Sequence, residues 1–329
     1  MDPVFILSSP RSFTSVVAGM VGMHPNLYSI PELHLLETDR LDELFALFMA
    51  ERQEKKLHGL RRLVSQLILG EQTLAGVRMT DRWLDKRMEL STADLYCELI
   101  AMAGGLGFVD KSPAYSLSPL TLERLARTFP ESKFIHLVRH PISQGLSMAK
   151  LLPLAVTARK RMAEVRSKYR EESTVIPPLA RDLMRVLSSA SGSESEQVLD
   201  IDFQYLWLRM QLRILAFLKE ISPARSMTLR GEDFLRDPIE QMQITSSFLG
   251  LPWSPDYEDS ILHPERSPYA CIGPQGAQFG NDINYLLSPC YSKRKFAVPD
   301  LSDLKIPWRT DGAQFNEEVI RLAHQFGYS

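Results

Sequence analysis

The sequence predicts an α/β protein in which helices flank a parallel β-sheet. Three short apolar runs, Val4–Leu7, Gly107–Asp110 and Lys133–Val138, have the length and composition of buried strands. Each run is followed by a polar segment and then by a helical pattern. This alternation of strands and helices is typical of a parallel sheet, because its strands are joined by helical crossovers.

The first predicted unit joins the strand Val4–Leu7 to a helix at Val16–Met23 through the polar turn Ser8–Ser15. The remaining elements follow from apolar spacing and from capping residues. They are strands at Leu27–Ile30 and Ser226–Leu229, and helices from Asp39, Leu57, Ser91, Ser118 and Pro141 and over Phe203–Leu218, Pro238–Leu249 and Phe315–Phe326. Residues 252–310 are rich in proline and show little periodicity.

The chain of 329 residues is long enough for one large domain with an insertion or for two smaller domains, and we predict a single domain over residues 1–329. Apolar residues make up 44% and charged residues 24% of the chain, which is ordinary for a globular protein. A net charge of −2 gives no overall attraction to nucleic acid, and no apolar run is long enough for a membrane span. The three cysteines are widely spaced and form no disulfide or zinc pattern, so we expect a cytoplasmic protein without a membrane partner.

Residues 151–200 differ from the rest of the chain. A cluster of arginine and lysine residues is followed by Pro177-Pro178 and then by the Ser/Gly/Glu-rich stretch Ser188–Gln197. We interpret the segment as an insertion, partly helical, that forms a lid over the active site.

The turn Ser8–Ser15 has the features of an anion-binding loop. A loop that leads from a strand into a helix offers backbone N–H groups and the positive end of the helix dipole. Arg11 adds a fixed positive charge, and Ser12, Thr14 and Ser15 add hydroxyl donors. The loop lacks the GxxxxGK[ST] pattern of ATP and GTP enzymes. A polar turn that only caps the helix is the alternative.

A second candidate anion site follows the strand Lys133–Val138. Arg139 stands at the end of this strand, and Ser147 lies eight residues further on, about two turns into a helix that starts near Pro141. In parallel sheets ligands bind outside the carboxyl ends of the strands, where both segments are expected. An unrelated surface arginine and an ordinary helix serine are the alternative.

Together these segments resemble the family of sulfotransferases that use 3′-phosphoadenosine 5′-phosphosulfate (PAPS). The resemblance implies a P-loop-like fold, a first loop that holds the 5′-phosphosulfate, and an Arg…Ser pair that holds the 3′-phosphate. The matching cofactor-binding positions are Arg11, Ser12, Phe13, Thr14, Ser15, Arg139 and Ser147, although glycine is common in the family where Phe13 stands here. Further matches are Asp110–Tyr115, Gly231–Pro238, Phe248–Pro252, Trp308-Arg309 and Phe326–Tyr328.

The candidate general base is a carboxylate or a histidine, because an acceptor hydroxyl must lose its proton as the new S–O bond forms. Glu32-Leu33-His34 resembles the family segment that supplies a catalytic glutamate. A structural role for both side chains is the alternative, and His263 is a rival base. Lys111 and Arg11 are expected to neutralise charge on the transferred group and on the leaving phosphate, so that no metal is required.

The acceptor is the least determined part of the site. Arg209 and Arg213 lie four residues apart on one predicted helix, where they can bind an anionic group or remain solvated. The chain resembles sulfotransferase domains of curacin-type and olefin-synthase-type polyketide synthases. That resemblance implies, as acceptor, the β-hydroxyl of an acyl chain on an acyl carrier protein, with free alcohols or sugars as alternatives. Other functions left open are a small-molecule kinase using ATP and a non-catalytic nucleotide-binding scaffold.

Overall fold

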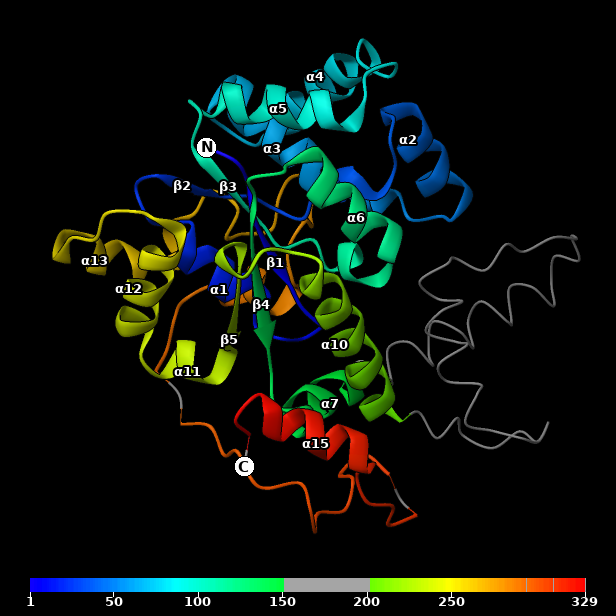
Figure 1. The fold of residues 1–329 in the computed structure, drawn as a ribbon. Helices are drawn as coiled ribbons and strands as arrows, with labels where there is room; N and C mark the ends of the chain where they lie inside the picture. The colour runs from blue at the N-terminus through cyan, green and yellow to red at the C-terminus, as the bar shows by residue number, and fades with distance from the viewer. Residues whose placement is uncertain (151–201, 294, 310, 329) are drawn as a thin grey trace, which may run out of the picture.

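The computed structural model describes residues 1–150, 202–293, 295–309 and 311–328 (Figure 1). Within these residues five strands form one parallel sheet in the order β2-β3-β1-β4-β5. The strands are β1 Val4–Leu7, β2 Leu27–Ser29, β3 Gly107–Asp110, β4 Lys133–Val138 and β5 Ser226–Arg230. β1 is therefore the central strand, with β3 on one side and β4 on the other, and the segments that follow these three strands meet at one edge.

Helices cover both faces of the sheet (Figure 1). Several begin at a side-chain cap that accepts a backbone N–H, such as Ser91 for α5 and Ser118 for α6. The α-helices are α1 Thr14–Val21, α2 Leu41–Ala50, α3 Leu57–Leu69, α4 Leu74–Asp85, α5 Thr92–Met102, α6 Pro119–Thr128, α7 Pro141–Ala149, α10 Phe203–Lys219, α11 Gly231–Arg236, α12 Pro238–Leu249, α13 Glu258–Ile261, α14 Ile283–Leu287 and α15 Glu317–Gln325. Short 3-10 helices include η1 Leu35–Glu37, η3 Pro113–Leu117 and η6 Pro264–Arg266.

The core consists of two layers separated by the sheet, because successive side chains of a strand point to opposite faces. On β1, Phe5 and Leu7 pack with α2, α3, α5, α6 and α10, whereas Val4 and Ile6 pack with α1, α12 and α13. All four side chains are at most 2% exposed. β1 is buried on both faces, as the continuous apolar run in the sequence indicated.

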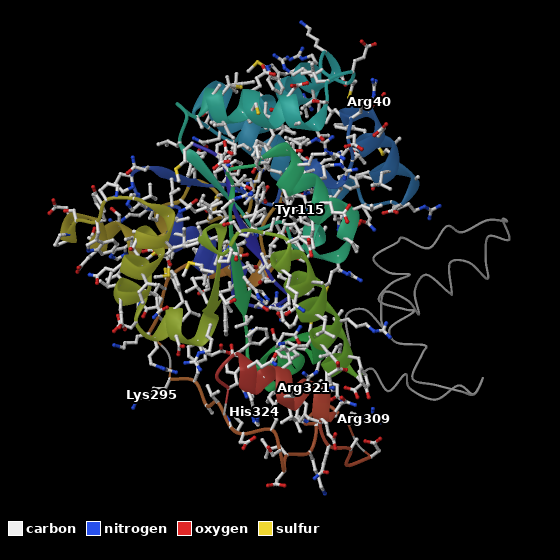
Figure 2. The ribbon with its side chains drawn as sticks, in the orientation of Figure 1. Arg40, Tyr115, Lys295, Arg309, Arg321 and His324 are labelled. Atoms are coloured by element: carbon white, nitrogen blue, oxygen red, sulfur yellow. The ribbon has the colours of Figure 1, made fainter. Side chains whose placement is uncertain are left out.

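A third apolar cluster holds α15 against the end of β4. Val138 at the end of β4 packs with Trp207 of α10 and with Val319 and Leu322 of α15. The opposite surface of α15 is polar, and Figure 2 shows Arg321 and His324 on it. The last turns of the described chain are therefore fixed next to the segment that follows β4.

The predicted α/β class, with a parallel sheet flanked by helices, is confirmed. The predicted bounds of β1, β3 and β4 agree with the structure, and α1 starts at Thr14 instead of Val16. Helix α4 was not predicted, because two of its four buried positions are Gly76 and Thr80, so that only Val77 and Leu84 mark its buried face with large apolar side chains. The proposed lid at 151–200 lies outside the described residues, and the single-domain assignment stays a prediction. Among the described residues no helix is long and apolar enough to cross a membrane.

Candidate active site

The loop Ser8–Ser15 connects β1 to α1 and has an unusual backbone. Arg11 and Phe13 have φ values of 66° and 64°, in the left-handed region that costs an L-residue about 1–2 kcal/mol. Alternation of left- and right-handed residues turns successive N–H groups toward one side and makes an anion-binding concavity. Three hydrogen bonds hold this shape: Ser9 Oγ with Ser12 Oγ at 3.0 Å, Gln211 Nε2 to Ser9 Oγ at 3.3 Å, and Gln144 Nε2 to the Pro10 carbonyl at 2.9 Å.

Phe13 gives the loop a second function. Its ring lies under the guanidinium of Arg139, with the Arg139 Cζ 3.9 Å from the ring centroid, and it forms a T-shaped pair with the Phe296 ring at a centroid distance of 5.5 Å. Arg139 also donates from Nη1 to the Arg11 carbonyl at 2.6 Å and from Nε to Ser143 Oγ at 2.8 Å. The two predicted anion sites are thus in direct contact, and the aromatic residue at a position where glycine is common serves as the platform for Arg139.

Arg11 is bound from two sides. Its Nε donates to Ser147 Oγ at 3.2 Å, and its Nη1 pairs with the carboxylate of Asp282. The backbone N–H of Asp282 donates to Ser15 Oγ at 3.3 Å, so the segment before α14 closes over the loop. Ser147 therefore lies beside Arg11, and Arg139 donates directly to the hydroxyl of Ser143. The sequence interpretation did not include Asp282, Ser143 or Gln211.

Lys111, Glu32 and His34 form a second charged cluster. Lys111 is only 1% exposed, and its Nζ donates to Glu32 Oε1 at 2.5 Å. His34 Nε2 lies 3.7 Å from Glu32 Oε2, and His34 Nδ1 donates to Glu37 Oε1 at 2.8 Å. Lys56 closes the row with an ion pair to Glu37 at 2.9 Å. Positive and negative groups alternate along this row, which stabilises each charged form despite its burial.

The pKa values of the two candidate bases move in opposite directions. Burial alone would raise the pKa of Glu32, but the Lys111 charge and the neighbouring His34 lower it to about 2. Burial alone would lower the pKa of His34, but the carboxylates of Glu32 and Glu37 raise it above its ordinary value. Glu32 is therefore ionised at neutral pH, while His34 tends to hold a proton and to act as a cation beside it.

The segment after β3 positions this cluster. Ser112 Oγ accepts the backbone N–H groups of Leu33 at 3.1 Å and of His34 at 3.3 Å, and donates to Asp110 Oδ1 at 2.7 Å. The buried Tyr115, in the interior of the molecule in Figure 2, donates to the other Asp110 oxygen at 3.3 Å. The stretch Asp110–Tyr115 thus places the Lys111 amine and supports the backbone that carries Glu32 and His34.

The other predicted site residues are less closely connected. The imidazole of His263 is 42% exposed and contacts Glu265 at 2.7 Å and Asp259 at 3.5 Å, both near it in sequence. On α10, Arg209 is exposed, whereas Arg213 donates to the carbonyl of Leu117. Roles for these three residues stay predictions. Among the described residues no group of three His, Cys, Asp or Glu side chains is arranged to hold a metal.

Fold and site together define an α/β protein in which the two predicted anion-binding segments meet at the carboxyl edge of a parallel sheet. The sequence model described as "Sulfotransferase family" matches residues 3–204, which is more than half of the chain. The chain belongs to the sulfotransferase family. No curated protein sequence matches it.

Two solved structures share the fold over the whole chain. One is the sulfotransferase domain from the curacin biosynthetic pathway, with 21% identity and a TM-score of 0.65 over 100% of this chain and 98% of that one. The other is the sulfotransferase domain from the olefin synthase of Synechococcus PCC 7002, with 24% identity and a TM-score of 0.63 over 100% and 95%. At this level of identity the likeness establishes the fold.

Proposed function

We propose that the protein transfers a sulfuryl group from PAPS to an acceptor hydroxyl. The observation that carries this proposal is the contact between the two anion sites, in which Arg139 stacks on Phe13 and donates to the Arg11 carbonyl. One ligand with anionic groups at two ends can engage both arginines. A carboxylate, Glu32, follows β2 and lies beside the buried Lys111, as a general base next to a charge-neutralising cation would.

The residues of the loop fit such a donor. Ser8 Oγ is buried, with the residue 1% exposed, and has no hydrogen-bond partner within the described part of the chain. An unpartnered buried hydroxyl is costly unless a ligand satisfies it. In our proposal Arg11, Ser12 and the first turn of α1 hold the 5′-phosphosulfate, and Arg139 holds the 3′-phosphate. When bound, PAPS supplies an activated sulfuryl group.

Glu32 is our first choice for the residue that accepts the proton of the acceptor hydroxyl. Its low pKa keeps it ionised, and the pairing with Lys111 also makes it a weak base. If Lys111 shifts toward the charge of the bound donor, Glu32 loses its closest cation and becomes more basic. His34, oriented by Glu37 through its Nδ1, would then stabilise the carboxylate as a cation or, in its neutral form, take the proton itself.

The acceptor we propose is the β-hydroxyl of an acyl chain presented by a carrier protein. Support comes from the two structural neighbours, which are sulfotransferase domains of the curacin pathway and of an olefin synthase. Arg209, exposed on α10, is our candidate for an anionic group of that acceptor, and Arg213 is the second.

Isothermal titration calorimetry with adenosine 3′,5′-bisphosphate tests the donor. We expect micromolar binding, and Arg139→Ala should weaken it by about 10- to 150-fold, the loss of a charge-assisted contact of about 1.5–3 kcal/mol. Tight binding of ATP–Mg with none of the bisphosphate would instead identify a small-molecule kinase. Mass spectrometry of acyl-carrier substrates after incubation with PAPS tests the acceptor, since each transfer adds one sulfuryl group. Binding without turnover on any hydroxyl substrate would favour a scaffold role.

A further inference from the structure

A buried carboxylate lies beneath the turn that follows β4. Glu232, in the first turn of α11, is 1% exposed. Its Oε1 accepts the backbone N–H of His140 at 3.0 Å and the hydroxyl of Ser143 at 3.2 Å, and its Oε2 accepts the hydroxyl of Tyr328 at 2.9 Å. A buried carboxylate needs such donors, because an unsatisfied charge in the interior is strongly unfavourable.

Two of these three hydrogen bonds act on the turn that carries Arg139. Ser143 Oγ accepts from the Nε of Arg139 at 2.8 Å, so the hydroxyl that contacts Glu232 also orients the guanidinium. The backbone N–H of His140 directly follows Arg139 in the chain. The indole of Trp207 donates to the Arg139 carbonyl at 2.9 Å and fixes the same residue from the other side. Glu232 therefore contacts both the backbone next to Arg139 and the hydroxyl that accepts from its guanidinium.

The third donor, Tyr328, is held in place by its own contacts. The residue is 1% exposed, and its ring meets the His140 ring edge-on with centroids 5.2 Å apart. The Cζ of Arg230 lies 5.5 Å from the centroid of the Tyr328 ring, and the same guanidinium donates to the carbonyl of Gly327. The chain reverses after α15 at Gly327, whose φ of 77° suits glycine, and this reversal carries the tyrosine inward.

We propose that Tyr328, acting through Glu232, is a positioning residue that sets Arg139 for the 3′-phosphate of the nucleotide. The inference rests on the proposed function and deepens it, because it assigns nucleotide selectivity to a residue outside both anion-binding segments. Without the tyrosine hydroxyl, the buried carboxylate lacks one of three donors and must seek another among the groups of the turn. The Ser143 hydroxyl has one proton, for which the His140 carbonyl and Glu232 Oε1 compete at 3.2 Å each. We expect this proton to move fully to the carboxylate, and the rotation of the hydroxyl would turn the Arg139 guanidinium away from the ligand.

The test compares two ligands that differ only in the 3′-phosphate. Calorimetry should measure the dissociation constants of adenosine 3′,5′-bisphosphate and of adenosine 5′-monophosphate for the unaltered protein and for Tyr328→Phe. We expect the substitution to weaken bisphosphate binding about tenfold and to change monophosphate binding less than twofold. A purely structural role would not move this ratio of the two constants.

Tyr291→Phe is the matched control. Its hydroxyl also donates to a single acceptor, the carbonyl of Leu235 at 3.0 Å, which is not part of the turn after β4. Glu232→Gln provides a second variant with little change of shape, because the amide retains an oxygen for His140 and can donate to Tyr328. It should weaken bisphosphate binding selectively, by a smaller factor than Tyr328→Phe.

Three outcomes decide the matter. Selective loss of bisphosphate binding in Tyr328→Phe, with Tyr291→Phe unchanged, supports the inference. Equal loss for both nucleotides, or no loss for either, overturns it, and if Tyr328→Phe does not fold, the same criteria apply to Glu232→Gln. If the unaltered protein binds neither nucleotide, the proposed function itself is wrong and the inference falls with it.

Discussion

Replacement of Asp282 by asparagine should strengthen nucleotide binding. In the structure the Asp282 carboxylate forms an ion pair with Arg11, the cation that we expect to bind the 5′-phosphosulfate. A donor must therefore displace this carboxylate before it can use Arg11. Asparagine removes the charge and can still cap α14, where the Asp282 side chain accepts the N–H of Asn284 at 2.9 Å.

The size of the effect follows from the exposure of the pair. Two unit charges about 4 Å apart at an effective dielectric constant of about 20 attract each other by about 4 kcal/mol. The side chains of Arg11 and Asp282 are 17% and 29% exposed, so water and salt screen part of this attraction. Exposed pairs contribute about 0.2–1 kcal/mol. We place this partly buried pair slightly higher, at about 1.4 kcal/mol, which corresponds to about tenfold tighter binding.

Calorimetry with adenosine 3′,5′-bisphosphate at low and high salt measures this change. The gain in affinity should shrink as the salt concentration rises, because ions screen the competing pair. Asp259→Asn is the control: it also removes one negative charge that pairs with an arginine, Arg266, but lies apart from the loop with a side chain that is 70% exposed. Unchanged or weaker binding by Asp282→Asn, with Asp259→Asn at the level of the unaltered protein, would refute the competition.

Glu32→Gln should lower turnover by about 10²–10⁴ while bisphosphate affinity stays nearly constant, since the amide cannot accept a proton. Because the pKa of Glu32 is about 2, the turnover rate should stay constant down to about pH 5 if Glu32 is the base. If His34 is the base, the rate should begin to fall at a pH above 6.5, because the pKa of His34 is raised from that value. The lowered pKa of Glu32 also stabilises the fold above pH 4.5, and this contribution is lost as the pH falls toward 2. The difference in unfolding temperature between the unaltered protein and Glu32→Gln should therefore shrink over this pH range. Gly59→Ala should reduce turnover without weakening nucleotide binding, because the added carbon would lie 1.9 Å from the Glu32 carbonyl oxygen. Gly76→Ala is the control, because its added carbon would lie 2.2 Å from the Ser65 hydroxyl instead. Equal turnover of the two variants would contradict this reasoning.

Local patterns were sufficient to predict the sheet and the position of the loop. The buried strands are short continuous apolar runs, and the rule that ligands bind at the carboxyl ends of parallel strands placed Arg11, Lys111 and Arg139 at one edge. The sequence placed Lys111 or Arg11 near Glu32 in general terms, and the contact with Lys111 in particular depends on the strand order, in which β2 and β3 are neighbours.

Pairings over long distances in the sequence could not be predicted in this way. Asp282 lies in a proline-rich region without periodicity, so no pattern connects it to Arg11. Gln211 occupies a helix whose buried positions are otherwise mostly apolar, and only the folded structure brings it to Ser9. The left-handed conformation of Phe13 could not be predicted either, because the sequence indicates that conformation only at glycine or asparagine.

The central position of β1 has a consequence for the way the chain folds. In the native register Val4 pairs with Val109 on one side and with Lys133 on the other, so the first strand has no neighbour until more than a hundred further residues exist. At about 5–20 residues per second, ribosomal synthesis of that stretch lasts on the order of ten seconds. During this interval an apolar strand and the loop after it remain unpaired, and the long sequence separation of the contacts slows their formation. The loop Ser8–Ser15 therefore cannot reach its final conformation before Gln144 and Gln211, which donate hydrogen bonds to it, have been synthesised. Slow production of the segment up to β4 would prolong the period in which β1 is open to aggregation.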